Sequence, residues 1–212
     1  MNTRGQDNVK ITSTGHEKSN FTVVLAITAA GEKLKTMVIF KKKLIPKGSF
    51  PDDVIVKTNV KGWMTKDLMQ DWIKEVWNKR EHYDPDPSKS LLIFDSARCH
   101  LTDEVKKAFQ QHTKIAVIPG GLTKLLQLLD VGVNKPFKDN LRIGWEQWMS
   151  DESSAEYTKS GIRKRMSYQQ AALLVSKSFG AISEGTIVHS FEKALREDDE
   201  NGIEDIDISF SF

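Results

Sequence analysis

Two aspartates in this chain stand where carboxylates can do metal chemistry. Asp95 directly follows an apolar run, Leu91–Phe94, and Asp130 stands before an amphipathic stretch. A buried strand that ends in a carboxylate delivers it to a sheet edge, where open α/β sheets place their ligands. Pairs or trios of carboxylates bind Mg²⁺, which prefers hard oxygen ligands. The pattern predicts a metal-binding pair, and the alternative for either aspartate is a helix cap or a solvated turn.

The segments around the two aspartates are expected to bring them to one sheet edge. Thr102 is a typical N-cap and begins a predicted helix, and a second apolar run, Ile115–Ile118, follows that helix. A strand, a helix and a second parallel strand form a right-handed crossover, in which both strands end at the same edge. We therefore expect Asp95 to point toward the loop between residues 119 and 130.

The first sixty residues predict an antiparallel β sheet. Strands are expected at residues 9–12, 21–28 and 37–40, and Ala30–Lys33 supplies a hairpin turn between the last two, because these stretches are rich in β-branched and apolar residues. A short extended segment is expected at residues 54–56.

Further helices are predicted where apolar side chains recur at steps of three and four residues. They cover residues 65–78, 130–149, 167–179 and 184–195. Trp72 and Trp77 fall on a wide apolar face, so we assign them to the core rather than to a base-stacking platform. In the second of these helices the apolar stripe extends as far as Trp145 and Trp148.

Basic clusters provide candidate phosphate contacts. Lys135, Lys138 and Arg142 lie on one face of the helix that follows Asp130. Side chains there are placed to hold phosphates that flank a phosphodiester site, and the alternative is an ordinary solubilising face. The same two interpretations apply to two other clusters, which are Arg163, Lys164 and Arg165, and Lys41, Lys42, Lys43 and Lys47.

Composition limits the possible classes of protein. The chain has 212 residues, the length of one domain, and 39% apolar residues, which suffice for a core. The formal net charge is +2, so any DNA-binding surface must come from uneven charge distribution. The single cysteine, Cys99, excludes an internal disulfide and a cysteine-rich zinc site and fits the nucleus or cytosol. We expect no membrane partner, because the longest apolar run is too short for a span. A phosphoaspartate hydrolase is set aside, because Ala97 stands where its second aspartate would be.

Several strings in the chain resemble the DDE superfamily endonuclease domain of pogo and Tigger transposable elements, which also occurs in jerky and centromere protein B relatives. The strings are Thr14–Lys18, Phe21–Ala26, Gly62–Met64, Phe94–Ser96 with His100–Thr102, and Gln127–Lys138. Their order along the chain also matches, and the likeness extends over nearly the whole length.

The resemblance implies an α/β fold, an RNase H-like mixed sheet flanked by helices, with three metal-binding acids. Asp95 matches the second acid and Asp130 the third. The first acid belongs to a central strand some tens of residues before Thr14, so this chain is expected to lack that strand and that acid. Asp7 has no strand pattern around it, and Leu128 stands where the family usually has proline. The implied cofactor is Mg²⁺ or Mn²⁺, with no small-molecule cofactor.

These expectations define a provisional organisation and function. Residues 1–8 form a polar segment, residues 9–195 a partial DDE domain, and residues 196–212 an acidic tail that could bind protein partners. The family chemistry is metal-dependent cleavage and transfer of DNA strands. We expect a nuclear, transposase-derived domain that binds DNA and is inactive by itself, because one acid is missing. The alternatives are an active endonuclease or transposase domain in a longer product, and a non-catalytic remnant that binds proteins.

Overall fold

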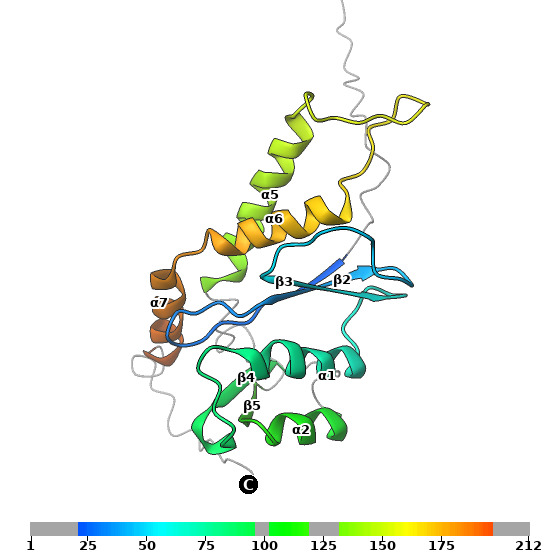
Figure 1. Cartoon of the computed structure of the whole chain (residues 1–212). Helices are drawn as coiled ribbons and strands as arrows, with labels where there is room; N and C mark the ends of the chain where they lie inside the picture. Colours follow the sequence, from blue (N-terminus) through cyan, green and yellow to red (C-terminus); the bar gives the residue numbers. More distant parts are fainter. Residues whose placement is uncertain (1–20, 96–101, 119–131, 197–212) are drawn as a thin grey trace, which may run out of the picture.

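The computed structural model describes residues 21–95, 102–118 and 132–196 of the chain (Figure 1). The strands are β1 (Phe21–Val24), β2 (Thr36–Lys41), β3 (Val54–Asn59), β4 (Leu91–Asp95) and β5 (Lys114–Ile118). The α-helices are α1 (Lys66–Glu75), α2 (Asp103–Gln110), α5 (Asn134–Ser150), α6 (Tyr168–Gly180) and α7 (Glu184–Arg196), and short 3₁₀ helices cover Trp77–Lys79 and Pro87–Lys89. The predicted strand at residues 9–12, Asp7 and the acidic tail from residue 197 lie outside the described residues.

β1, β2 and β3 form a mixed sheet in which β2 is central. β1 pairs antiparallel with β2, as predicted, and the hairpin between them turns at Gly31, whose φ is +93°. β3 runs parallel to β2, with Thr36 opposite Val54 and Lys41 opposite Asn59. The sequence predicted only a short extended segment here, so the parallel pairing is new information from the structure.

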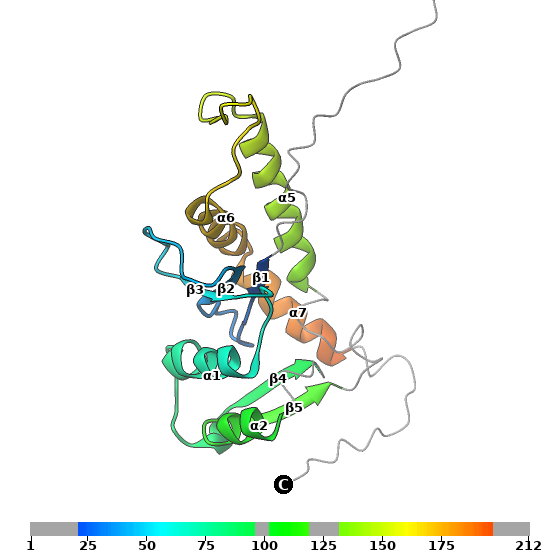
Figure 2. The same ribbon diagram turned by 90° about the vertical axis from the view of Figure 1, so that its right-hand side faces the viewer.

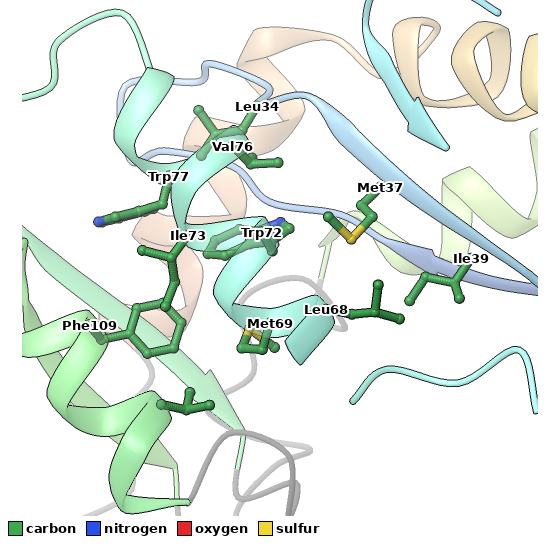
Figure 3. Packing of buried hydrophobic residues seen from close by; sticks show 11 residues of the cluster. Leu34, Met37, Ile39, Leu68, Met69, Trp72, Ile73, Val76, Trp77 and Phe109 are labelled. Carbon is green, nitrogen blue, oxygen red and sulfur yellow. The ribbon is translucent and has the colours of Figure 1, made fainter. Parts of the chain in front are cut away.

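β2 is buried on both faces and joins two hydrophobic clusters. Because side chains alternate along a strand, Met37 and Ile39 pack with α1 and α2 (Figure 3), whereas Val38 and Phe40 pack with α5, α6 and α7. These four side chains are at most 2% exposed. Figure 1 shows the result: α1 covers one side of the three-stranded sheet, and α5 and α6 cover the other.

α1 contributes the predicted apolar face to the first cluster. Thr65 accepts a hydrogen bond from the backbone N–H of Leu68 and so caps the helix. Trp72 and Trp77 are 4% and 5% exposed, which confirms that both belong to the core. Phe109 of α2 contacts the Trp72 ring at a centroid distance of 6.2 Å.

β4 and β5 form a second, two-stranded sheet. They run parallel, with α2 as the crossover between them (Figure 2), and Thr102 caps α2 by accepting from the Val105 N–H. The predicted strand, helix and parallel strand are thus confirmed. Among the described residues the strands form two sheets, and the whole is a mixed α/β arrangement consistent with the RNase H-like fold that the resemblance implies.

The C-terminal helices follow the predicted order. Phe137 is 5% exposed and packs edge-on against Phe179 of α6 at 6.2 Å. Trp145, at the far end of the same apolar stripe, is 44% exposed. The C-terminal half of α5 extends beyond the sheet, as both views show (Figures 1 and 2), so the apolar stripe continues past the core it was expected to face.

By length and composition, no single helix in the described part of the chain could cross a membrane. Among the described helices, only α6 and α7 together are long and apolar enough, and they are bent by 65° relative to each other. Val175, Phe179 and Ile187 of this pair are buried in the second hydrophobic cluster.

Candidate functional site

Asp95 is the last residue of β4, at the edge where β4 and β5 both end. The register pairs Asp95 with Ile118, the last residue of β5. β4 is held in this position because Leu92 and Phe94 pack against the first hydrophobic cluster, where the Phe94 and Phe109 rings lie 5.4 Å apart. The backbone therefore places Asp95 where the crossover predicted it.

Asp130 lies outside the described residues, so its distance from Asp95 stays a prediction. The nearest described residues are firmly anchored. Gly132 lies against Ser190 of α7, so closely that a Cβ at this position would overlap the serine hydroxyl. Val133 is fully buried, and its carbonyl accepts from the Phe137 N–H in the first turn of α5. The entry into α5 is thus fixed against α6 and α7.

The donor set of the predicted pair suits a hard divalent cation. Two carboxylates, one at a strand end and one before a helix, are oxygen ligands of the kind Mg²⁺ and Mn²⁺ accept. Within the ranges that the structure describes, no three histidine, cysteine, aspartate or glutamate residues lie close enough together to hold a metal ion.

The basic residues of α5 lie at the surface of the described part of the chain. Lys135, Lys138 and Arg142 are all exposed, and none forms an ion pair with another described residue. A set of exposed, unpaired cations on one helix is compatible with phosphate contact and also with a solubilising face. The prediction for these three residues stays a prediction.

Residues 163–165 do not form one basic surface. Arg163 is only 8% exposed, and its guanidinium donates to the carbonyls of Trp148, Met149 and Asp151 at 2.6, 3.0 and 3.0 Å. It therefore satisfies carbonyls at the end of α5, which have no partners within the helix. Lys164 is exposed and pairs with Glu156 at 2.9 Å, and Arg165 is exposed. Because Arg163 is buried and both terminal nitrogens of its guanidinium bond within the chain, we leave it out of the candidate DNA contacts.

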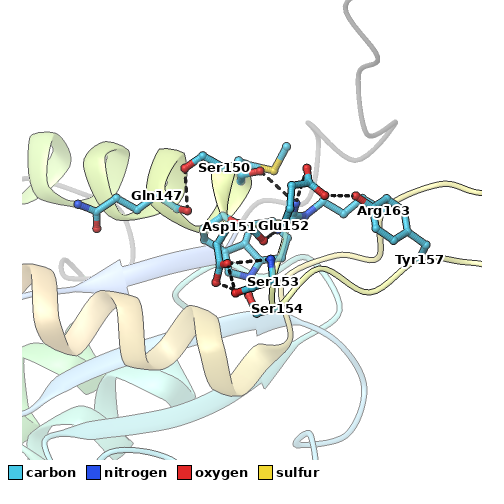
Figure 4. Close-up of polar contacts among 10 residues, drawn as sticks. Gln147, Ser150, Asp151, Glu152, Ser153, Ser154, Tyr157 and Arg163 are labelled. Carbon is cyan, nitrogen blue, oxygen red and sulfur yellow. Dashed lines mark hydrogen bonds and ion pairs between the residues drawn. The ribbon is translucent and has the colours of Figure 1, made fainter.

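The loop that begins at Asp151 is held by a second set of polar contacts (Figure 4). The Asp151 carboxylate accepts from the hydroxyls of Ser153 and Ser154, both at 2.6 Å. These hydrogen bonds lower the pKa of Asp151 from its usual value to about 2. Tyr157 donates to Glu152 at 2.6 Å, and this contact raises the pKa of the tyrosine. The segment is a structured arm rather than an exposed basic tripeptide.

Sequence reasoning missed Lys61 and Trp63 as candidates. Trp63 is 66% exposed although it is a large aromatic residue, and the Lys61 ammonium lies 5.8 Å from the centre of its ring. Gly62–Met64 entered the sequence analysis only as one of the strings that resemble the family. The signal that could have found this site is the absence of any acidic residue between Val54 and Lys66.

Comparison with known proteins identifies the family. Residues 18–191 match the family described as DDE superfamily endonuclease. The chain belongs to this family. It is 34% identical over 194 residues to a mouse protein named "Pogo transposable element with KRAB domain", and equally to the human protein of that name. Each alignment covers 91% of this chain and 32% of the relative, so the chain spans about a third of these relatives' length.

More distant relatives agree with this assignment. A human protein named "Pogo transposable element with ZNF domain" is 31% identical over 126 residues, which is 59% of this chain and 9% of that protein. The human "Jerky protein homolog" is 26% identical over 132 residues, 58% of this chain and 23% of the relative. No solved structure matches the chain significantly. The DDE endonuclease domain is therefore transposase-derived and nuclease-like, as the strings quoted above implied.

Proposed function

We propose that this DDE endonuclease domain binds DNA in the nucleus and that Asp95 and Asp130 form its metal-binding pair. The observation that carries the proposal is the parallel crossover from β4 through α2 to β5, which places Asp95, the last residue of β4, at the edge where both strands end, in a chain that matches the family over residues 18–191. In an open α/β sheet the carboxyl ends of the strands are where ligands bind. The nuclear location follows from DNA as the ligand.

The residues of this chain would divide the work between holding metal and holding DNA. When bound, Mg²⁺ or Mn²⁺ supplies activation of a water or 3′-hydroxyl and stabilises the leaving oxygen of a phosphodiester. The carboxylates of Asp95 and Asp130 would hold the ion. Lys135, Lys138 and Arg142 would neutralise flanking phosphates and so fix the position of the strand without reading its sequence.

We further propose that the 212-residue chain alone binds DNA without cleaving it. A site with two carboxylates has fewer ligands than a two-metal site needs, so charge that develops in the transition state is poorly stabilised. A longer product that supplies a third acid would restore cleavage. Because a longer product with a third acid would cleave DNA, the experiment uses the 212-residue chain by itself.

The metal pair is tested by titrating Mn²⁺ and following its electron paramagnetic resonance signal. The Asp95→Asn, Asp130→Asn variant is compared with wild type and with Asp139→Asn, which removes an exposed aspartate from α5. We expect Mn²⁺ affinity to fall at least about tenfold in the double variant, because both charged ligands are lost, and to stay unchanged in the control. Equal affinity in all three proteins would refute the metal pair.

Cleavage and DNA binding are measured on the same proteins. We expect no Mg²⁺- or Mn²⁺-dependent nicking of supercoiled DNA by wild type, and nicking that disappears in the double variant would refute the inactive state. For duplex binding, Lys138→Gln, Arg142→Gln is compared with Lys106→Gln, Lys107→Gln on α2. Loss of two phosphate contacts should lower the slope of log affinity against log salt by about 1.8 in the first variant only. Equal slopes would remove α5 from the DNA surface.

A further inference from the structure

β2 and β3 run parallel and finish at the same end of the sheet (Figure 1). The segments that follow them carry an exposed aromatic residue and several lysines. We define the lysine–tryptophan patch by its members, which are Lys41, Lys42, Lys43, Lys47, Lys61 and Trp63. All six side chains are exposed, and Trp63 is the most exposed aromatic side chain of the described residues, at 66%. A large aromatic ring that stays exposed gives up the stabilisation that burial would provide, so the exposure of Trp63 indicates a binding role.

A fixed turn presents Trp63 to solvent. Gly62 has φ of +72°, a conformation that favours glycine, and its carbonyl accepts a hydrogen bond of 2.7 Å from the Thr22 hydroxyl of β1. A Cβ on Gly62 would lie 3.1 Å from the Lys41 side chain, so the turn packs tightly on the end of β2. The backbone that carries Trp63 is therefore fixed without a ligand.

The lysines are attached to the same framework. The Lys42 backbone N–H donates to the Asn59 carbonyl at 3.1 Å, which ties the lysine loop to β3. The Lys42 ammonium lies 4.7 Å from the centre of the Tyr168 ring, at the start of α6. Lys61 lies 5.8 Å from the Trp63 ring, near the limit of about 6 Å for a cation–π contact, so a stacked base could displace it.

The two chain segments that form the patch carry only positive charges. No aspartate or glutamate occurs between Thr36 and Pro51 or between Val54 and Lys66. The two other lysines in these stretches are used elsewhere: Lys57 pairs with Asp71 and Glu75 of α1, and Lys66 pairs with Glu104 of α2. The five lysines of the patch form no ion pair with any described residue.

We propose that the lysine–tryptophan patch binds a DNA strand that has unpaired bases, with Trp63 stacked on one base and the lysines on its phosphates. Positive grooves combined with exposed aromatic rings are how proteins bind single strands without sequence preference. An acidic peptide would complement the lysines but has no planar group for the ring. The inference rests on the proposed function only in that DNA is the ligand. The patch contains neither Asp95 nor any residue of α5, and it needs no metal.

The test measures binding of an oligothymidylate of about 16 nucleotides by fluorescence anisotropy, without divalent metal. Trp63→Ala should weaken binding about fivefold or more, whereas Trp63→Phe, which keeps a ring, should lose less. Tyr157→Ala is the matched control, because Tyr157 is also exposed, at 48%, but lies outside the patch and donates its hydroxyl to Glu152. Circular dichroism confirms that each variant is folded.

Lysine substitutions give a second, independent readout. Lys42→Gln, Lys61→Gln should lower the salt slope of oligothymidylate binding by about 1.4, because two single-strand phosphate contacts are lost. Lys74→Gln, Lys79→Gln removes two exposed lysines from α1 and the following 3₁₀ helix and should leave the slope unchanged.

Four outcomes would overturn the proposal. They are no oligothymidylate binding by wild type, no effect of Trp63→Ala, equal effects of the two lysine pairs, and equally tight, Trp63-dependent binding of polyglutamate, which would indicate a protein-binding surface. A fully paired duplex should not respond to Trp63→Ala. Failure here leaves Mn²⁺ binding by Asp95 and Asp130 untouched, and failure of the metal pair leaves oligothymidylate binding untouched, so the two proposals can fail separately.

Discussion

Replacing Arg163 by alanine is the sharpest test of how the α5 arm is held. The guanidinium makes hydrogen bonds of 2.6 to 3.0 Å with carbonyls of Trp148, Met149 and Asp151, and its charge lies 4.7 Å from the centre of the Trp148 ring. Hydrogen bonds to a charged group contribute about 1.5 to 3 kcal/mol each. Water can replace part of this near the exposed Asp151, so we expect a net loss of about 3 kcal/mol.

This loss should remain local. The arm from residue 151 to 166 closes through an isolated antiparallel bridge between Tyr157 and Arg163, and neither hydrophobic cluster contains a residue from it. Isolated hairpins are marginally stable, so about 3 kcal/mol exceeds what holds the arm closed. Arg163→Ala should therefore open the arm while the core stays folded.

Hydrogen–deuterium exchange resolves the two regions. Amides such as those of Thr158 and Lys164, which bond within the arm, should exchange up to about 100-fold faster in Arg163→Ala. Amides of β2 should be unchanged. Lys164→Ala is the control, because its ion pair with Glu156 is exposed and worth less than about 1 kcal/mol. Unchanged exchange in the arm, or equal acceleration in β2, would refute the reasoning.

Other predictions concern stability. Phe109→Ala should cost about 3 to 5 kcal/mol in guanidinium unfolding, because Phe109 is 1% exposed and belongs to the first cluster. Ser167→Ala should cost about 1 kcal/mol by the same measurement, because it removes the capping box of α6. Lys57→Met should cost about 1 kcal/mol, since its two carboxylate partners on α1 are partly exposed. The carboxyl carbon of Asp151 should titrate by NMR with a midpoint of about 2. Because folding lowers this pKa, its stabilisation is present above about pH 4 and is lost as pH falls through about 2.

Each of these four predictions has an outcome that would contradict it. A cost below about 1 kcal/mol for Phe109→Ala would mean that the cluster repacks around the cavity. An unaffected Ser167→Ala would mean that α6 is held by packing alone, and Lys57→Met with higher stability would mean that desolvation of the lysine outweighs its pairs. An ordinary titration of Asp151 near pH 4 would show that the serine hydroxyls do not bind it in solution.

Local signals predicted the elements well. The sequence predicts helices that begin at Thr65, Thr102 and Ser167, and each of these side chains accepts the N-cap hydrogen bond. A cap depends on residues within one turn, so the sequence contains all the information it needs. Partners distant in sequence were harder. The parallel pairing of β2 and β3 depends on a loop that returns along the sheet, and an apolar run indicates a strand without indicating its neighbour.

The same limit applies to the elements around the candidate site. The apolar stripe of α5 has helical spacing throughout, but spacing cannot tell where the core stops, so the exposure of Trp145 could not be predicted. Arg163 has the composition of a phosphate contact, and only the folded arm brings carbonyls to its guanidinium. Asp95 was placed correctly at its strand end because β4 and its crossover are local in sequence. Asp130 follows a longer loop, and its position stays a prediction.

β2 couples the proposed sites to one another through its two faces. Val38 and Phe40 support the cluster that holds α5, whereas Met37 and Ile39 support the cluster that holds β4. Its last residue, Lys41, belongs to the lysine–tryptophan patch. A core substitution in β2 can therefore move the α5 cations or the Asp95 strand without touching either. Loss of DNA binding in such a variant would identify no contact surface, which is why the proposed tests change only side chains at the sites themselves.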